Sequence, residues 1–391
     1  MFDTLSPAAA DPILSVVEAF RADARPHKLD LSVGVYRDVQ GQTPVMAAVK
    51  AAERALCEAQ ASKSYLGLAG NTAFLDAVMQ LCLPADREAA RWTAIQTPGA
   101  SGALRLLADL LTATRPGLTV WISDPSYVNH APILRAAGLQ VASYPYLDVA
   151  SGSLRRDALF DTLAGLGPDD VLLLHGCCHN PSGVDLSLAD WQRIAGMASR
   201  QGFLPWVDLA YQGFGDGVEA DAAGLQILAR ALPQLLVAYS CSKHFGLYRE
   251  RTGAAMLLSR SAASAQRVQG KLFELARRSY SMAPDHGAEV VARILASPAL
   301  TQQWHEELDG MRARIVCIRS RLADALAARG LDGERLRRHK GMFFMLPLSP
   351  VQVEQLRAEH AVYLVGGGRL NLAGLDETRC DDLAVALAAV A

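Results

Sequence analysis

Residues 239–253 read YSCSKHFGLYRERTG, and they place one lysine, Lys243, directly after the apolar run 234–240. A lysine that ends a strand is in most proteins a solvated cap or the partner of a carboxylate. A lysine that is partly buried beside other cations has a lowered pKa, however, and acts as a nucleophilic amine suited to Schiff bases. The rest of the chain decides between these two interpretations.

The run before Lys243 is one of several short apolar runs that alternate with helical patterns between residues 44 and 299. Continuous apolar runs separated by helices are typical of a mostly parallel sheet covered on both faces. Ligands of such sheets bind at the carboxyl ends of the strands, and polar residues follow these runs at that place. The predicted strands are 118–123, 170–176, 202–210, 234–240 and 253–259.

The chain after residue 300 has a different pattern. A long helical stretch, 300–330, precedes the apolar segments KGMFFML and AVYLVGG and two shorter helical patterns, 351–360 and 380–390. This order indicates a smaller α+β domain. We therefore predict an α/β protein with a large domain of residues 44–300 and a small domain that combines residues 1–43 with 301–391.

Composition excludes several classes of protein. The 391 residues carry a formal net charge of -2, so the chain shows no basic footprint for nucleic acid. No apolar run reaches the roughly 18 residues of a membrane span. The start, MFDTLSPAAADPIL, lacks a basic segment, and seven scattered cysteines fit free thiols. We expect a cytoplasmic protein without nucleic-acid or membrane partners.

Lys243 is surrounded in sequence by groups that suit a phosphate. Ser240 and Ser242 flank it, and Arg249 and Arg251 follow. Small hydroxyls with an arginine fork are common phosphate ligands. A Schiff-base lysine beside a phosphate site indicates pyridoxal phosphate, because that cofactor carries both an aldehyde and a phosphate.

Other strand ends supply the remaining groups that this cofactor needs. Asp208, whose alternative role is a helix N-cap, could keep the pyridine nitrogen protonated. Tyr211 and Asn180 could donate to the ring hydroxyl. The turn TPGASG feeds a helical pattern and offers backbone N–H groups and Ser101 to the phosphate. That turn alone would also fit an ordinary capped helix.

Together these ordered motifs resemble the class I aminotransferases of the aspartate and aromatic amino acid type, which are fold type I pyridoxal phosphate enzymes. The resemblance runs nearly end to end, from DPILSVVEAF through LSVGVYRD to GRLNLAG. Its most specific motifs are QTPGASGALR, SDPSYVNH, HGCCHNPSG, DLAYQGFG and SCSKHFGLYRERTG. The fold that it implies is a mostly parallel central sheet covered by helices, with a smaller α+β domain.

The resemblance implies roles for single residues. Lys243 would hold the cofactor and move the substrate proton, with Asp208 and Tyr211 as the other catalytic residues. His130 would support Asp208, and Tyr127 would stack on the ring. The cofactor-binding residues that it implies are Tyr65 (from the other subunit of a homodimer), Ala100, Ser101, Tyr127, His130, Asn180, Asp208, Tyr211, Ser240, Lys243 and Arg251.

The resemblance also implies a substrate site shared between two subunits. Arg369 would clamp the substrate α-carboxylate as a bidentate fork, which a lysine could not mimic. Gly34 would line the mouth, where its backbone can approach closely. Arg277 would reach across the dimer to a side-chain carboxylate. Asn180 and Tyr127 complete the predicted substrate-binding residues.

Some positions depart from the family pattern. Tyr127 stands where the stacking residue is usually Trp, and it keeps a π face of smaller area. Gly99 and Met282 stand where aspartate enzymes tend to carry Ser and Asn, which favours the aromatic branch. Arg37 and Thr43 look more like the aspartate branch.

The predicted function is transfer of an amino group between an aromatic or dicarboxylic L-amino acid and a 2-oxo acid such as 2-oxoglutarate, with a lean towards aromatic amino acids. Aspartate aminotransferase and a specialised biosynthetic transaminase remain alternatives. A pyridoxal phosphate lyase fits less well because Arg277 suits a second carboxylate. A regulator would need a DNA-binding segment, for which the chain has no spare length.

Cys177 and Cys178 are adjacent, and two neighbouring residues of a strand point to opposite faces. We therefore expect them to serve packing, and we predict no metal site.

Overall fold

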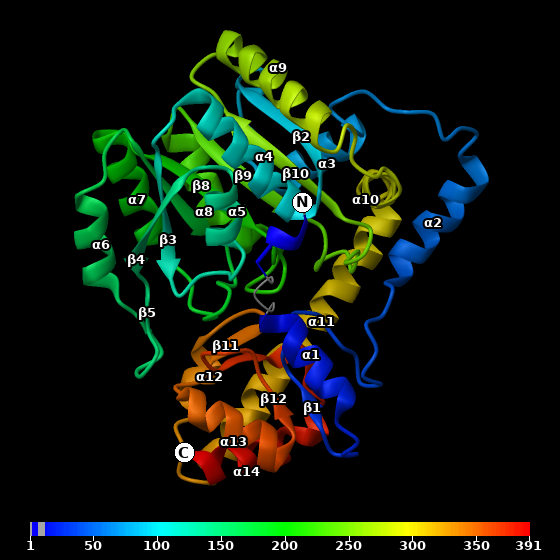
Figure 1. Ribbon diagram of the computed structural model, residues 1–391. Helices are drawn as coiled ribbons and strands as arrows, with labels where there is room; N and C mark the ends of the chain where they lie inside the picture. The colour runs from blue at the N-terminus through cyan, green and yellow to red at the C-terminus, as the bar shows by residue number, and fades with distance from the viewer. Residues whose placement is uncertain (1, 7–11) are drawn as a thin grey trace.

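The computed structural model describes residues 2–6 and 12–391, so residues 1 and 7–11 of the predicted small domain lie outside the described residues. The chain forms a large α/β part and a smaller part below it, and α11 (Pro298–Ala327) runs from one into the other (Figure 1). No helix in the described ranges has both the length and the apolar character that crossing a membrane requires.

A seven-stranded sheet forms the centre of the large part. The predicted strands are confirmed with shifts of one or two residues at their ends, and the central β3, β7, β8 and β9 are parallel. In spatial order the strands are β2 (Trp92–Pro98), β10 (Thr252–Leu258), β9 (Leu235–Ser240), β8 (Leu204–Leu209), β7 (Asp170–His175), β3 (Thr119–Asp124) and β4 (Gln140–Pro145).

Successive residues of the central strands enter two different cores, which explains their continuous apolar runs. Val171 and Leu173 of β7 pack with α4, α5 and α9, whereas Leu172 and Leu174 pack with the helices of the other face. One face carries α4 (Gly99–Thr114), α5 (His130–Ala136) and α9 (Ala262–Ser279). The other carries α3 (Thr72–Cys82), α6 (Arg156–Ala164), α7 (Leu188–Gln201), α8 (Val218–Ala231) and α10 (His286–Ala296), and α2 (Ala47–Ala59) packs on α10 and α11.

Two features of this sheet differ from the prediction that was based on the apolar runs. The edge strands β2 and β4 were not predicted, because polar residues interrupt their apolar pattern; Thr93, Gln96 and Thr97 are buried in β2. β10 is antiparallel to both neighbours, because the connection 241–251 holds only turns and no crossover helix.

The smaller part has a core of its own. Strand β1 (Leu29–Asp30) pairs in parallel with β12 (Val362–Tyr363), so a segment near the N-terminus packs with the C-terminal residues. The predicted boundaries at residues 43 and 300 remain predictions. The other elements of this part are α1 (Pro12–Ala22), α12 (Glu334–Arg338), β11 (Phe343–Met345), α13 (Pro350–His360), β13 (Arg369–Asn371) and α14 (Cys380–Val390).

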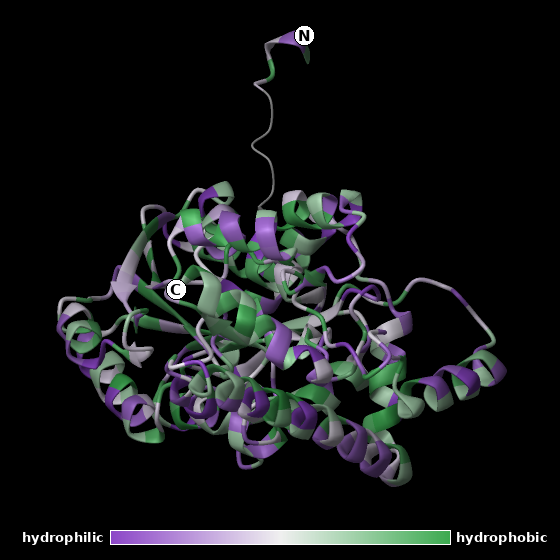
Figure 2. Cartoon of the chain, turned by 90° about the horizontal axis from the view of Figure 1, so that it is seen from below, coloured by the Kyte–Doolittle hydropathy of each residue, from purple (hydrophilic) through white to green (hydrophobic). Residues whose placement is uncertain are grey.

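Polar residues lie mainly on the outward faces of the helices, and the loop between α2 and α3 extends away from the body (Figure 2). This loop holds Tyr65, whose side chain is 94% exposed, and the partly exposed Leu66 and Leu68.

Glycine is required where β10 meets the start of α4. A Cβ on Gly253 would lie 2.5 Å from the carbonyl carbon of Gly99 and 2.6 Å from the carbonyl oxygen of Tyr239, and neither backbone atom can move freely. Gly253→Ala should therefore lower the free energy of unfolding by about 3 kcal/mol or more.

Gly270→Ala is the matched control, since nothing lies within 4 Å of its Cβ position inside α9. It should stabilise the protein by about 0.5–1 kcal/mol. Urea unfolding of both variants measures the difference, and equal stabilities would show that the contact at Gly253 is not tight.

Candidate active site

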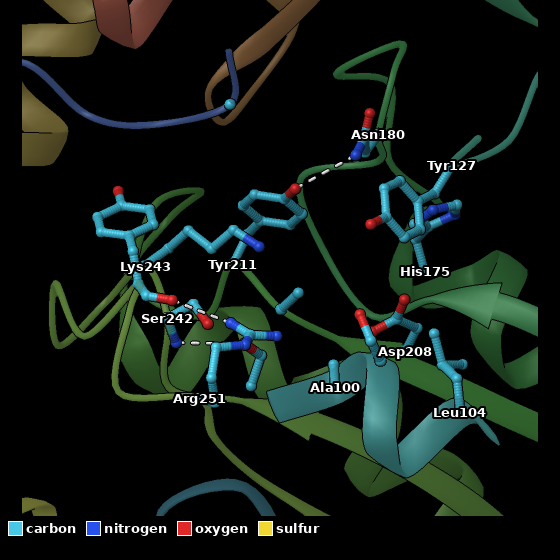
Figure 3. Close-up of a pocket in the computed structure, with 15 residues that line it drawn as sticks. Ala100, Leu104, Tyr127, His175, Asn180, Asp208, Tyr211, Ser242, Lys243 and Arg251 are labelled. Atoms are coloured by element: carbon cyan, nitrogen blue, oxygen red, sulfur yellow. Dashed lines mark hydrogen bonds between the residues drawn. The ribbon is translucent and has the colours of Figure 1, made fainter. Parts of the chain in front are cut away.

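The carboxyl ends of the central strands and the first turn of α4 surround one pocket (Figure 3). Most of the predicted cofactor residues line it, although they come from distant parts of the chain. These are Ala100, Ser101, Tyr127, Asn180, Asp208, Tyr211, Ser240, Lys243 and Arg251, and Gly34, a predicted substrate-binding residue, lines the pocket as well. Ser242, which flanks Lys243 in the predicted phosphate-binding segment, also lines the pocket, and the residues that were not predicted are Leu104, His175, Ala210 and Tyr248.

Lys243 lies three residues beyond the end of β9, whose residues are all buried, and its side chain lines the pocket. Its Nζ lies 4.7 Å from the centre of the Tyr211 ring. Burial lowers the pKa of the Lys243 amine to about 8; the charge of Arg251 acts in the same direction and that of Asp208 opposes both. The amine is therefore partly neutral near physiological pH, as a nucleophile requires.

Asp208 is the buried acid of the pocket. Its Oδ2 lies 2.9 Å from Nε2 of His130, and the other ring nitrogen of His130 lies 2.9 Å from Oγ of Ser126. Burial alone would raise the pKa of the Asp208 carboxyl, but the hydrogen bond with His130 and the nearby positive groups bring it below its ordinary value. His130 thus stands behind Asp208, as the family resemblance implied.

The second carboxylate oxygen of Asp208 is buried and has no hydrogen-bond partner among the described residues. A buried acceptor of this kind is costly unless a donor meets it. A protonated pyridine nitrogen is a donor that fits this position, so the acid side of the pocket suits pyridoxal phosphate.

His175 is a pocket residue that was not predicted from the sequence. It is the last residue of β7, lines the pocket, and has no partner for either ring nitrogen within the described part of the chain. Burial, followed by the neighbouring His130, lowers the pKa of His175 to about 3, so its ring is neutral. Its position at a strand end was the signal that could have identified it.

Tyr211 and Asn180 meet at one side of the pocket. The Nδ2 of Asn180 donates to the Tyr211 hydroxyl at 3.2 Å (Figure 3). Burial raises the pKa of Tyr211, so the hydroxyl stays protonated and can donate to an acceptor in the pocket. Tyr127 stands near His175, with its ring perpendicular to that of His130.

The opposite side of the pocket has the character of an anion site. α4 begins at Gly99, and no side chain of the described ranges caps its first turn. Arg251 lies against this turn: a Cβ on Gly99 would come within 2.6 Å of its Nη2. Arg251 has no carboxylate partner among the described residues and donates to the carbonyl of Tyr248. With Ser101 and Ser240 nearby, these donors fit a phosphate group.

Four predicted residues lie outside the pocket lining: His130, which stands behind Asp208, and Arg369, Tyr65 and Arg277. Arg369 is buried on β13, where its guanidinium lies 4.9 Å from the Phe343 ring, and Phe343 in turn meets Tyr211 edge-on at 5.7 Å. Tyr65 is exposed, and so is Arg277, whose Nη1 donates to Ser281. Within one chain the structure does not bring Tyr65 and Arg277 to the pocket.

Cys177 and Cys178 do not point to opposite faces, so that expectation was wrong. Strand β7 ends at His175, and Cys178 has a φ of 49°, which breaks the alternation. Both sulfur atoms lie within 4.8 Å of an Asp221 carboxylate oxygen and of each other. The Asp221 carboxylate accepts backbone N–H groups of residues 213, 215 and 216, which closes that loop, and both cysteines belong to the apolar core.

Comparison with known proteins agrees with this geometry. Residues 26–387 match the family model described as aminotransferase class I and II. The chain is 49% identical to a tyrosine aminotransferase of Rhizobium meliloti, with 98% of each chain covered. It is 42% identical to an aspartate aminotransferase of Salmonella typhi over the full length of both.

A solved structure is similar over the whole chain. The aromatic-amino-acid aminotransferase of Burkholderia pseudomallei, covalently bound to pyridoxal phosphate, superposes with a TM-score of 0.97 at 40% identity. The match covers 100% of this chain and 99% of the other.

The amine of Lys243 should titrate at an unusually low pH. In protein freed of cofactor, its reaction with an amine-directed reagent should follow a curve with its midpoint near pH 8 rather than near 10.5. Mass spectrometry of the peptide that contains Lys243 measures this, with exposed Lys50 as the internal comparison.

The same shift should make folding stability rise between pH 8 and 10.5, because only the unfolded chain holds the Lys243 proton there. Lys243→Met should remove that rise. A labelling midpoint near 10.5 would mean that the amine is solvated.

Proposed function

The chain belongs to the class I and II aminotransferases, and on that premise we propose that it transfers the amino group of aromatic L-amino acids to a 2-oxo acid such as 2-oxoglutarate. The aminotransferase reaction and the pyridoxal phosphate cofactor follow from the family. The observation that carries the proposal is the pocket itself, which combines the low-pKa amine of Lys243 with a buried carboxylate and an anion site.

Pyridoxal phosphate, when bound, supplies an aldehyde and a ring that accepts electrons from the substrate Cα. In our proposal Lys243 holds the cofactor covalently and then, as a free amine, takes the proton from the substrate Cα. The unpaired oxygen of Asp208 would hold a proton on the pyridine nitrogen, and the hydrogen bond with His130 would fix the orientation of that carboxylate.

The remaining cofactor residues would hold the cofactor in position and would transfer no proton. The Tyr211 hydroxyl and the Asn180 amide would donate to the ring oxygen, and Tyr127 would cover one face of the ring. Arg251, Ser240, Ser101 and the N–H of Ala100 would bind the phosphate. The uncapped first turn of α4 supports this assignment, because its N–H groups and its dipole favour an anion.

Arg369 is our candidate for the substrate α-carboxylate. Its Nε is buried without a partner in the described ranges, while Nη2 donates to the carbonyl of Ser32. Burial lowers the pKa of Arg369 but leaves it a cation at neutral pH. Gly34, whose Cβ position would lie 2.9 Å from the Phe343 ring, leaves room at the mouth.

The proposed preference for aromatic substrates rests on the apolar residues around the site and on the names of similar proteins. Tyr127 lines the pocket, and the Phe343 ring lies against Arg369. Met282 contacts the exposed loop at Leu66. The relative that is 49% identical carries the name tyrosine aminotransferase, and the aspartate aminotransferase is 42% identical. A dicarboxylic substrate remains the second candidate, because Arg277 is an exposed cation without a carboxylate partner among the described residues.

We further propose a homodimer in the cytoplasm. Tyr65 is 94% exposed on a loop that extends from the body, which suits a residue that completes a neighbouring subunit's pocket. Three exposed apolar residues on the segments before and after α2 add to this surface: Val45, Leu66 and Leu68. The free cysteines support a reducing compartment.

A panel of amino acids tests the proposed substrate. The absorbance of the bound cofactor, followed after mixing with single amino acids, should change with tyrosine and phenylalanine at a kcat/KM at least about tenfold above that for aspartate, a difference of roughly 1.4 kcal/mol. Lys243→Ala should fold but should release no 2-oxo acid from any of them, because it lacks the amine that takes the Cα proton. A preference for aspartate would replace the aromatic assignment.

Arg277 should matter only for substrates with a second carboxylate. Arg277→Leu should lower kcat/KM for aspartate and glutamate by about 100-fold, because a carboxylate loses its charged partner, and should lower it for phenylalanine by less than about threefold. Arg278→Leu, at the neighbouring exposed residue that pairs with Glu274, is the matched control. Equal losses on all three substrates would remove the proposed role.

A further inference from the structure

The hydroxyl of Tyr248 joins two segments that are far apart in the sequence. Tyr248 lies in the turn after Lys243 and lines the pocket. Its Oη accepts the backbone N–H of Tyr36 at 3.0 Å. Tyr36 belongs to residues 31–37, LSVGVYR, which we call the strap and which carries the pocket residue Gly34.

The other side of the strap is fixed to the C-terminal part of the chain. The Asn371 side chain donates to the carbonyls of residues 33 and 35, and its backbone N–H donates to that of Leu31. Arg369 donates to the Ser32 carbonyl, and the Arg37 N–H donates to Ala373. Among the hydrogen bonds of the described residues, the one from Tyr36 to Tyr248 alone ties the strap to the loop 241–251 that carries Lys243.

Tyr248 is suited to hold this contact. Its own carbonyl accepts Arg251 Nη1 at 3.0 Å, so its backbone is fixed to the anion side of the pocket. Burial raises the pKa of the Tyr248 hydroxyl to about 12, so it stays protonated at neutral pH and accepts the N–H of Tyr36 through its lone pairs.

The position of the strap determines the size of the pocket mouth. Gly34 approaches the Phe343 ring so closely that a Cβ would lie 2.9 Å from it, and Phe343 in turn contacts Tyr211 and Arg369. Strap, Phe343 and Arg369 therefore form one packed unit on the substrate side. A shift of the strap away from the Lys243 loop would widen the gap between Lys243 and Arg369.

We propose that Tyr248 is a positioning residue whose hydroxyl clamps the strap to the Lys243 loop and so holds Gly34 and Arg369 at the distance that an amino acid substrate needs. This proposal rests on the proposed aminotransferase function only for its effect on catalysis. The clamp acts on substrate binding through the strap, and Tyr248 itself transfers no proton.

The test uses Tyr248→Phe in the holoenzyme, because this change removes one oxygen and keeps the ring. Hydrogen–deuterium exchange should become faster in the peptide that contains Tyr36 and should stay unchanged in the peptides of β8 and β9. KM for the amino acid should rise about three- to tenfold, the effect of one hydrogen bond, while kcat changes by less than about twofold. The cofactor absorbance should not change.

Tyr144→Phe is the matched control. Its buried hydroxyl donates to the carbonyl of Leu173 at 3.0 Å inside the sheet, away from the strap. It should lower the melting temperature as Tyr248→Phe does or more, but leave KM and the exchange of the strap unchanged.

Two results would overturn the proposal. Unchanged exchange at Tyr36 would show that the hydroxyl does not hold the strap. A fall in kcat or in cofactor absorbance with unchanged KM would place Tyr248 on the cofactor instead. If no amino acid reacts with the wild-type holoenzyme, the proposed function fails, and the exchange measurement still decides whether the clamp exists.

Discussion

The pocket depends on one buried interaction, the hydrogen bond between Asp208 and His130. Burial alone would raise the pKa of the Asp208 carboxyl, and the hydrogen bond with His130 is the largest effect that lowers it. The ionised carboxylate then opposes the effect of burial on Lys243, whose pKa settles at about 8 instead of lower. Because Asp208 lies next to the carboxyl end of β8 and Lys243 follows β9, the parallel pairing of these two strands places both groups in one pocket.

The smaller part of the chain contributes Arg369, our candidate for the substrate side of the site. Arg369 on β13 contacts Phe343, which meets the pocket residue Tyr211 edge-on, and Gly34 of the strap 31–37 lines the pocket. The cofactor side is built from the ends of strands and from α4, whereas the substrate side is held by a few hydrogen bonds to a single extended segment. We infer that the substrate side is the more easily deformed of the two.

The amino-acid sequence predicted the strands that matter for the cofactor, because a strand buried on both faces leaves a continuous apolar run. Polar residues at or just beyond the ends of those runs, such as Asp208 and Asn180, could be identified for the same reason. β2 and β4 lie at the edges and carry polar residues, and the reversed direction of β10 depends on a short connection, so neither feature was visible as a run. Tyr248 could not be identified, because its partner Tyr36 is 212 positions away. The roles of Tyr65 and Arg277 stay predictions, since both lie outside the pocket of a single chain.

The identity of the cofactor-bearing lysine is the central claim, and it can be measured directly. Borohydride reduction of the holoenzyme fixes the cofactor to the lysine that holds it, and peptide mass spectrometry then locates the added mass. We predict that the mass lies on Lys243 in the peptide from the turn after β9. Its appearance on another lysine, such as Lys340 between α12 and β11 of the smaller part, would contradict the proposed site.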